Sequence, residues 1–469
     1  MQKSSETARR DTLQGRPCQL DGEIPPADGR RDPPPITFAT IDITGPLSKI
    51  SVVVRPVNGT DANVLPYLKP HEGKLMADTI LLGTRKGTVI IDRQAAGWRA
   101  RPINHAGVPV CYAARDPRDG TLWASLDHGH WGPKLSRSRD RGRTWDDISS
   151  LKYPKGARHL VQYLPTPDFD PAAPAGRPDY AGATVYKIWH IAFGSAGQPG
   201  RLYAGTIPGG LFVSDDGGDT WTLNRPLWNH ESRGGDLFAG DATSENHWGG
   251  TPASVDYGVF EPGIHSVIVD PRNPDHLHVA VSSAGVLETT DGGQTWAGCN
   301  RGLLMDYLPN PEAEWGHDPH FVTHCPGQPD HLWQQNHCGV FYSDDGAQNW
   351  RKVSRPEVGV HFGFPVAVDG RDGRTAWVVP ARGDSERMAI DGGLFVARTS
   401  DGGQSWQTFR NGLPQEDAHD IVLRHGLDVA GDRLCFGSTT GNVYLSENRG
   451  ETWRCLGNNF PPIYSVRFG

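Results

Sequence analysis

The octapeptide SDDGGDTW at residues 214–221 recurs, in related form, five more times along this chain of 469 residues. The other copies are SRDRGRTW (138–145), TTDGGQTW (289–296), SDDGAQNW (343–350), TSDGGQSW (399–406) and SENRGETW (446–453). The shared pattern is Ser or Thr, any residue, Asp or Asn, any residue, Gly, any residue, Thr or Ser, and Trp. Only 343–350 departs from it clearly, with Ala347 and Asn349. Six copies at intervals of several tens of residues indicate a repeat architecture.

The residue types that the six copies share suit a tight turn between two strands. Asp or Asn accepts N–H bonds within its own turn, and Gly supplies the positive φ that other residues avoid. The Trp then leaves the turn on a strand and wedges between neighbouring sheets. Six copies placed at the same turn cannot all serve one active site. We therefore predict that the box carboxylates are structural, and neither catalytic nor Ca²⁺ ligands.

Short apolar stretches recur before every box and predict four strands per repeat. The predicted first strands are 110–117, 188–195, 264–271, 319–326, 364–370 and 419–425. A second strand, a third strand leading into the box, and a fourth strand after the Trp complete each unit. Four short strands in a unit of about 45–55 residues are typical of a propeller blade.

The two ends of the repeat region predict how the ring closes. Residues 79–100 contain second, third and fourth strands but no first strand, whereas IYSVRFG at 463–469 matches a first strand with nothing after it. Joining the two makes a seventh blade and leaves no free sheet edge. The predicted fold is an all-β, seven-bladed β-propeller over residues 76–469, closed by the C-terminal strand.

Composition supports this fold class and excludes others. The chain has 58 Gly, 38 Pro and 15 Trp, and a Gly and Pro content this high disfavours helical bundles. The net charge of −8 argues against a nucleic-acid partner. The sequence has no run of about 18 apolar residues, so we expect no membrane-spanning helix.

The first 75 residues differ from the repeats, because they hold ten prolines and no Trp. We expect a Pro-rich N-terminal extension, disordered over 1–35 and a small appendage over 36–75 with strands within 36–43 and 50–57. This N-terminal extension shows no apolar segment of the kind that a secretory signal carries. The seven cysteines form no C-x-x-C pair, which favours reduced thiols and a cytoplasmic location.

The boxes resemble the Asp-box (BNR) repeats of the sialidase-like β-propeller superfamily. Phrases such as DHGHWGPKL (127–135) and WQQNHCGVFYSDDG (333–346) are similar to bacterial BNR-repeat or glycosyl-hydrolase-like proteins. The resemblance implies the fold, and its seven-bladed relatives include xyloglucan-cleaving glycosidases with paired Asp residues and a non-enzymatic photosystem II assembly factor. The FRIP motif of true sialidases does not occur in this sequence, so we do not expect classical sialidase activity.

Histidines recur at the position of the first strands that lies nearest the propeller axis. Aligning these strands makes four histidines equivalent, namely His190, His265, His320 and His419, while Cys111, Phe364 and Tyr464 fill the other three positions. Converging imidazoles suit a transition metal such as Fe²⁺, Zn²⁺ or Cu²⁺. The alternative is a metal-free ring of histidines that bond to channel water, carbonyls or Tyr464.

The turns between second and third strands share the axial mouth with these positions. They supply candidates for proton transfer, namely His128, His337 and Glu386, to which Tyr464 is added as a catalytic candidate. They also supply candidates for substrate binding, namely Arg85, Lys86, His130, Trp131, Arg382 and Arg387. Cys338 is predicted to pack rather than react, because neighbouring strand residues point to opposite sides.

Long insertions fall on the same face and bring more carboxylates. These are Asp236, Asp241, Glu245, Asp256, Glu261, Glu314 and Asp318. They are too many for one acid/base pair to be chosen from the sequence.

Three functions follow as hypotheses. The first is a metal-dependent hydrolase, lyase or oxygenase that acts on a small polar or glycan-like substrate in a His-rich axial pocket. The second is a metal-free glycoside hydrolase with paired carboxylates. The third is a non-catalytic propeller that docks a protein partner on the same face.

Overall fold

The computed structural model describes residues 41–44, 51–54, 78–148, 151–161, 179–235, 238, 248, 262–306 and 310–469. The chain divides into two compact units, residues 1–72 and 73–469. In the first, strands β1 (Ile41–Thr44) and β2 (Ser51–Val54) pair antiparallel. Each overlaps one of the two stretches predicted to form a strand.

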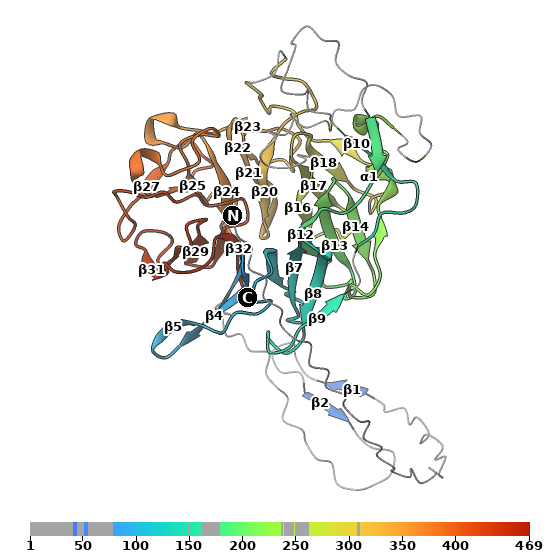
Figure 1. The fold of residues 1–469 in the computed structure, drawn as a ribbon, viewed down its shortest axis with the longest axis horizontal. Coiled ribbons are helices and arrows are strands. Elements are labelled where there is room, and N and C mark those ends of the chain that lie inside the picture. The colour runs from blue at the N-terminus through green and yellow to red at the C-terminus, as the bar shows by residue number, and fades with distance from the viewer. Residues whose placement is uncertain are drawn as a thin grey trace, which may run out of the picture. The chain divides into compact units, whose positions relative to one another are not determined.

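The second unit is a seven-bladed β-propeller, which confirms the predicted fold class (Figure 1). Six blades are built from consecutive antiparallel strands. Blades one to three comprise β6 (Val110–Arg115), β7 (Leu122–His128), β8 (Gly132–Ser138) and β9 (Asp146–Ile148); β12 (Lys187–Phe193), β13 (Leu202–Ile207), β14 (Leu211–Ser214) and β15 (Thr222–Leu223); and β16 (Ile264–Val269), β17 (Leu277–Val281), β18 (Gly285–Thr289) and β19 (Ala297–Gly298). Blades four to six comprise β20 (Pro319–Cys325), β21 (Gln328–Asn336), β22 (Gly339–Ser343) and β23 (Arg351–Lys352); β24 (Gly363–Val368), β25 (Ala376–Pro380), β26 (Val396–Thr399) and β27 (Gln407–Phe409); and β28 (Leu427–Ala430), β29 (Arg433–Gly437), β30 (Val443–Ser446) and β31 (Arg454–Gly457).

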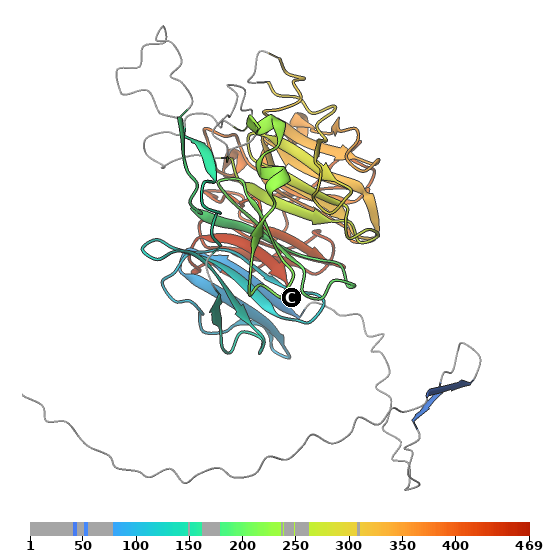
Figure 2. The ribbon, with the colours of Figure 1, turned by 90° about the vertical axis from the view of Figure 1, so that its right-hand side faces the viewer.

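The C-terminal strand closes the ring, as predicted. β32 (Ile463–Phe468) pairs with β3 (Thr79–Thr84), which continues into β4 (Gly87–Gln94) and β5 (Gly97–Ala100). The pairing runs from Ile80 opposite Phe468 to Thr84 opposite Ile463. Figure 2 shows the blue N-terminal strands of the propeller beside its red C-terminal strands. This closure removes the two edges that an open ring would expose.

Among the described residues, little regular structure lies outside the blades. A further hairpin joins β10 (Arg158–Val161) to β11 (Asp179–Gly182), and the helices are α1 (Arg225–Trp228), η1 (Glu231–Arg233), η2 (Pro356–Val358) and η3 (Ile390–Gly392). None of these described helices has the length and apolar character that a membrane-spanning helix needs. The described cysteines are free thiols.

The boxes clip their hairpins in the predicted way. In the box at 399–406, Asp401 accepts hydrogen bonds from the Ser405 amide at 3.0 Å, the Ser405 hydroxyl at 2.6 Å and the Thr399 hydroxyl at 2.8 Å. The Trp406 indole is 9% exposed and donates to the Val353 carbonyl of the preceding blade at 2.9 Å. The same pattern of bonds recurs around Asp140, Asp216, Asp291, Asp345 and Asn448. Each carboxylate is thus occupied by its own turn.

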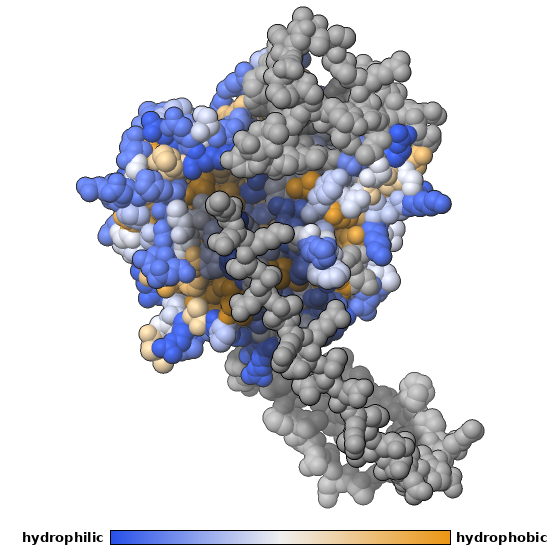
Figure 3. Space-filling view, in the orientation of Figure 1, coloured by the Kyte–Doolittle hydropathy of each residue, from blue (hydrophilic) through white to orange (hydrophobic). Residues whose placement is uncertain are grey.

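The cores lie between adjacent blades, where apolar residues of successive sheets interdigitate. In Figure 1 the inner strands β12, β16, β20 and β24 lie near the middle and the outer strands β5, β27 and β31 at the periphery. Hydrophilic residues dominate the rim of the face in Figure 3, and hydrophobic residues gather toward its middle. The first strands therefore carry the side chains that can meet at the axis.

Candidate functional site at the propeller mouth

Five of the seven first strands share a β-bulge close to the axis. In β6, Val110 pairs with Leu126 and Tyr112 with the adjacent Ser125, so Cys111 is an extra residue in the ladder. By the same pairing, the extra residues in other blades are Trp189, His265, His320 and Tyr464. A bulge bends the strand and redirects the side chain of its extra residue, and bulges are common beside active sites.

This register corrects the predicted equivalence of the histidines. In β12 the bulge falls between Ile188 and His190, so Trp189, and not His190, corresponds to His265 and His320. His190 pairs with Gly205 and occupies the next position along the strand. Aligning the first strands by sequence alone does not reveal this shift of one residue.

The prediction for His419 is also wrong. Residues 419–425 are not the first strand of blade six, because β28 begins only at Leu427, and His419 lies exposed before it. Ile421 is buried against Phe362 and Phe364, so the apolar triplet packs as a loop. His425 is the residue that reaches the axis: its Nε2 lies 2.7 Å from the His265 carbonyl oxygen and its ring centroid 5.4 Å from that of His190.

The buried histidines do not converge as four metal ligands. Among the described residues, no three of His190, His265, His320 and His425 form a group whose ligand nitrogens all lie within 4.8 Å of one another. The His265 ring packs edge-on against Trp189, with centroids 5.5 Å apart. Burial lowers the pKa of His190 to about 3 and holds the pKa values of His265 and His425 well below 6.5, so these rings are neutral.

An axial pocket of about 290 Å³ opens among the bulged residues. We use this name for the cavity lined by Arg85, Pro109, Cys111, Asp127, Lys187, Trp189, Leu423, Arg424, His425 and Tyr464. Its volume lies near the lower end of the range for small-molecule sites. Arg85 and Tyr464 were predicted at the mouth, whereas Lys187, Trp189 and Arg424 were missed because their sequence neighbourhoods carry no motif.

The pocket carries an excess of positive charge. Arg85, Lys187 and Arg424 face a single carboxylate, Asp127, which lies 3.8 Å from the Lys187 Nζ. Burial lowers the pKa of Arg424 to about 10, and the nearby Asp318 opposes this shift. Arg424 therefore stays charged at neutral pH. The pocket can attract an anionic group.

A second cluster, which we call the mouth triad, lies next to Arg424. It consists of Asp318, His320 and His337, whose ligand atoms all lie within 4.8 Å of one another. The Asp318 Oδ2 is 3.7 Å from both His320 Nε2 and His337 Nδ1. Arg424 Nε donates to the His320 carbonyl at 3.0 Å, which connects the triad to the pocket wall.

Hydrogen bonding and charge determine which atoms of the mouth triad could hold a metal ion. His320 Nδ1 lies 2.6 Å from the Gly363 carbonyl, which can only accept, so Nδ1 carries the proton and Nε2 keeps its lone pair. Burial lowers the pKa of His320, which keeps the ring neutral. Burial opposes the ionisation of Asp318, but its positively charged surroundings, Arg424 among them, hold its pKa well below the ordinary range. Two imidazoles and one carboxylate are thus available together, a donor set that suits Zn²⁺ or Fe²⁺.

The other predicted residues lie around the rim. Lys86, His130 and Trp131 are exposed, and none of them lines the axial pocket. His128 is partly buried at the end of β7. The insertion of blade five forms exposed ion pairs, Arg382 with Glu386 at 2.8 Å and Arg387 with Asp384 at 2.5 Å.

Glu386 is therefore paired away from the pocket, while Arg387 lies over the Phe364 ring at 5.4 Å. Of the insertion carboxylates, Glu314 and Asp318 are described; the others, Asp236, Asp241, Glu245, Asp256 and Glu261, lie outside the described residues.

Comparison with known proteins agrees with the repeats. The BNR/Asp-box repeat family matches residues 212–223. An oligoxyloglucan-reducing end-specific xyloglucanase of Emericella nidulans is 30% identical over 173 residues, which cover 34% of this chain and 19% of that protein. The match thus spans about a fifth of the length of that relative.

The chain also aligns with solved structures. An ancestral GH74 enzyme aligns at 15% identity with a TM-score of 0.47, covering 75% of this chain and 39% of that one. A putative 6-phosphogluconolactonase of Bacteroides fragilis aligns at 10% identity with a TM-score of 0.47, covering 83% and 97%. These alignments carry no argument about function, which has to be argued from the site.

Proposed function

We propose that this chain, an Asp-box repeat β-propeller, is a hydrolase that takes a small, polar, glycan-like molecule bearing a carboxylate into the axial pocket. The observation that carries the proposal is the joining of two features through Arg424: a cationic pocket, and a triad of metal-ligating side chains. The 30% identity to a xyloglucanase over part of the chain supports the glycan class. The charge of the pocket supports the acidic substituent.

Arg85, Lys187 and Arg424 would bind the substrate carboxylate, and Trp189 would offer an aromatic face to the sugar ring. Burial raises the pKa of Tyr464, so its hydroxyl keeps the proton at neutral pH and can donate to a substrate oxygen. Asp127, which lies beside Lys187, can accept from a sugar hydroxyl. Together these groups would orient a single small ring within the pocket.

We further propose that Asp318, His320 and His337 hold a divalent metal, Zn²⁺ or Fe²⁺, because two histidines and one carboxylate are a ligand set that both ions use. Their separations of 3.7 Å are close to the spacing of about 3.4 Å between ligands that each lie about 2.1 Å from a tetrahedral zinc ion. When bound, the metal would supply a Lewis acid beside the pocket. The Gly363 carbonyl fixes the His320 ring for this role.

The test is hydrolysis of 4-nitrophenyl glycosides and 4-nitrophenyl uronides by purified full-length protein, with metal content measured in parallel. We expect activity on a uronide, loss of that activity after chelation, and recovery with Zn²⁺ or Fe²⁺. Asp318→Asn should lower kcat/KM by at least about 100-fold through loss of a ligand. His130→Ala, at the exposed rim, is the matched control and should stay within about twofold.

The alternatives give different results. Activity that survives complete chelation favours the metal-free hydrolase with paired carboxylates. Absence of turnover and of sugar binding, together with capture of a protein partner that competes at the mouth, favours the docking propeller.

A further inference from the structure

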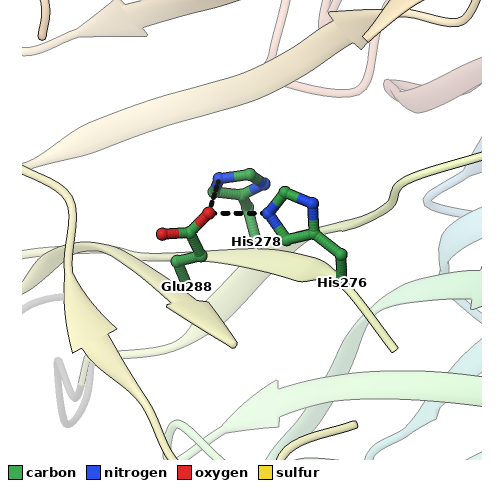
Figure 4. Close-up of side chains that lie close together, drawn as sticks. All are labelled: His276, His278 and Glu288. Atoms are coloured by element: carbon green, nitrogen blue, oxygen red, sulfur yellow. Dashed lines mark hydrogen bonds and ion pairs between the residues drawn. The ribbon is translucent and has the colours of Figure 1, made fainter. Parts of the chain in front are cut away.

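Blade three carries a second group of metal-ligating side chains, outside the mouth triad (Figure 4). His278 and Glu288 are direct cross-strand partners in β17 and β18. His276 precedes His278 by two residues, and side chains two apart along an extended chain share one face of a sheet. The group lies at the end of the blade where the third strand leads into its Asp-box, whereas the mouth is formed by the opposite ends of the strands.

The three side chains point toward one another. Glu288 Oε1 lies 2.6 Å from His276 Nε2 and 3.5 Å from His278 Nε2. All three ligand atoms lie within 4.8 Å of one another, and the two ring centroids are 4.9 Å apart. The side chains are 18%, 6% and 16% exposed, so a small ion can reach them while most of their water is displaced.

A second layer of contacts fixes this group. His276 Nδ1 lies 3.2 Å from the Asp270 Oδ2, and Arg272 holds the same oxygen at 2.6 Å. The other oxygen of Glu288, Oε2, accepts from the Gln348 amide at 3.1 Å and from the Cys299 thiol at 3.4 Å. A carboxylate on the far nitrogen of a histidine, and donors on the free oxygen of a carboxylate, are typical supports of metal ligands.

The propeller scaffold does not require these residue types. The pairs that occupy the same register as His278 and Glu288 in three other blades are Trp123 with Arg137, Trp333 with Tyr342, and Trp377 with Arg398. Trp377 donates from its indole to the Arg449 carbonyl in the box of the next blade at 2.9 Å. His278 Nε2 makes the corresponding contact with the Gly346 carbonyl at 3.3 Å. Packing therefore needs a ring with one polar contact, and it does not explain why His276 and Glu288 face that ring.

We propose that His276, His278 and Glu288 bind a zinc ion through the two Nε2 atoms and Oε1, with water as the fourth ligand. Ligands about 2.1 Å from a tetrahedral zinc lie about 3.4 Å apart, so the contact between His276 and Glu288 widens on binding. Zinc also replaces the Nε2 protons through which His276 meets Glu288 and His278 meets the Gly346 carbonyl, and these protons leave for solvent. The ion fastens β17 and β18 beside the box at 343–350, which contacts Glu288 through the Gln348 amide. Its role is to stabilise the junction of blades three and four.

The test uses the full chain carrying Asp318→Asn, which removes the proposed ligand set at the mouth. After chelation and dialysis, calorimetric titration with Zn²⁺ should show one equivalent bound, with release of protons to the buffer. Adding His276→Gln should weaken zinc binding at least about tenfold and abolish the zinc-dependent rise in the thermal midpoint. Adding His331→Gln instead, at the same register position in blade four, should change neither.

Zinc stoichiometry and affinity that are the same with His276→Gln and without it would overturn the proposal and leave a proton-linked network. If that variant does not fold, zinc-edge anomalous scattering from crystals of the unsubstituted chain decides: a peak between His276 and Glu288 supports the site, and its absence at saturating zinc rejects it. Because the mouth triad is removed in the titration, this outcome is independent of the proposed hydrolase activity.

Discussion

The guanidinium of Arg424 lies 4.7 Å from the centroid of the Trp189 ring, and it is also a lining group of the axial pocket. The indole is the extra residue of a bulge in blade two, and the arginine belongs to the segment before β28 in blade six. Arg424 further donates to the His320 carbonyl in blade four. One partly buried cation thus connects three blades at the place where substrate is proposed to bind.

Removing this charge tests its role in binding. Arg424→Met keeps a long apolar stem that can still cover Trp189 but cannot pair with an anion. We expect the affinity for a uronide, measured by isothermal titration calorimetry, to fall by at least about tenfold, since one charge-assisted hydrogen bond contributes about 1.5–3 kcal/mol.

Arg382→Met is the matched control for this prediction, because Arg382 is an exposed arginine paired with Glu386. Its affinity should match that of the parent. Equal losses in the two variants would mean that general surface charge, and not the pocket, governs binding.

The fold and its closure could be predicted from sequence because they depend on local signals. The Asp-boxes are turns whose hydrogen bonds stay within a few residues, as around Asp401, and the lone strand at 463–469 has a single complementary gap. The site depends on register, which a single extra residue changes. Trp189 therefore took the place predicted for His190, and no periodicity in the sequence distinguishes the two.

Long-range packing also explains why the sequence alone did not single out His425 and Asp318. The apolar residues near 421 suit a strand, but burial of Ile421 against Phe362 and Phe364 keeps the segment as a loop. This long-range packing brings His425 to the axis and leaves His419 exposed. Asp318 stood among seven candidate carboxylates, and only its distances to His320 and His337 single it out.

Substitutions of His419 and His425 test this difference in packing. His425→Ala removes a fully buried ring that bonds the His265 carbonyl and contacts Tyr112 and His190, so we expect a loss of about 2–4 kcal/mol in the free energy of unfolding. His419→Ala should change it by less than about 0.5 kcal/mol, because the side chain is exposed. Urea denaturation followed by Trp fluorescence measures both. Comparable losses would show that residue 419 packs in the folded protein.

Neutral burial of the axial histidines predicts acid sensitivity. His190 has a pKa of about 3 in the folded state, and burial keeps the pKa values of His265 and His425 well below 6.5. Near pH 6.5 and below, the unfolded chain takes up protons that the folded chain excludes, so stability is complete above that pH and falls as pH decreases toward 3. Each such histidine contributes a slope of about 1.4 kcal/mol per pH unit within this window.

Unfolding free energies between pH 7.5 and 4.5 test this assignment. His190→Gln should lower the slope of unfolding free energy against pH by about the contribution of one histidine, although the variant is less stable at pH 7.5. A slope unchanged by the substitution would mean that His190 is protonated in the folded protein, which contradicts its assigned neutral state.

The box carboxylates, by contrast, should influence stability and leave the mouth unaffected. Asp401→Ala deletes the acceptor of three hydrogen bonds within the turn at 399–406, and we expect a loss of about 1–2 kcal/mol in the free energy of unfolding. Ser400→Ala, at an exposed variable position of the same box, should stay within about 0.5 kcal/mol. Uronide affinity and metal content should match the parent in both variants, because the hydrogen bonds of the Asp401 carboxylate lie within its own turn. A variant that kept its stability but lost metal or ligand binding would instead give the box carboxylate a direct part in the site.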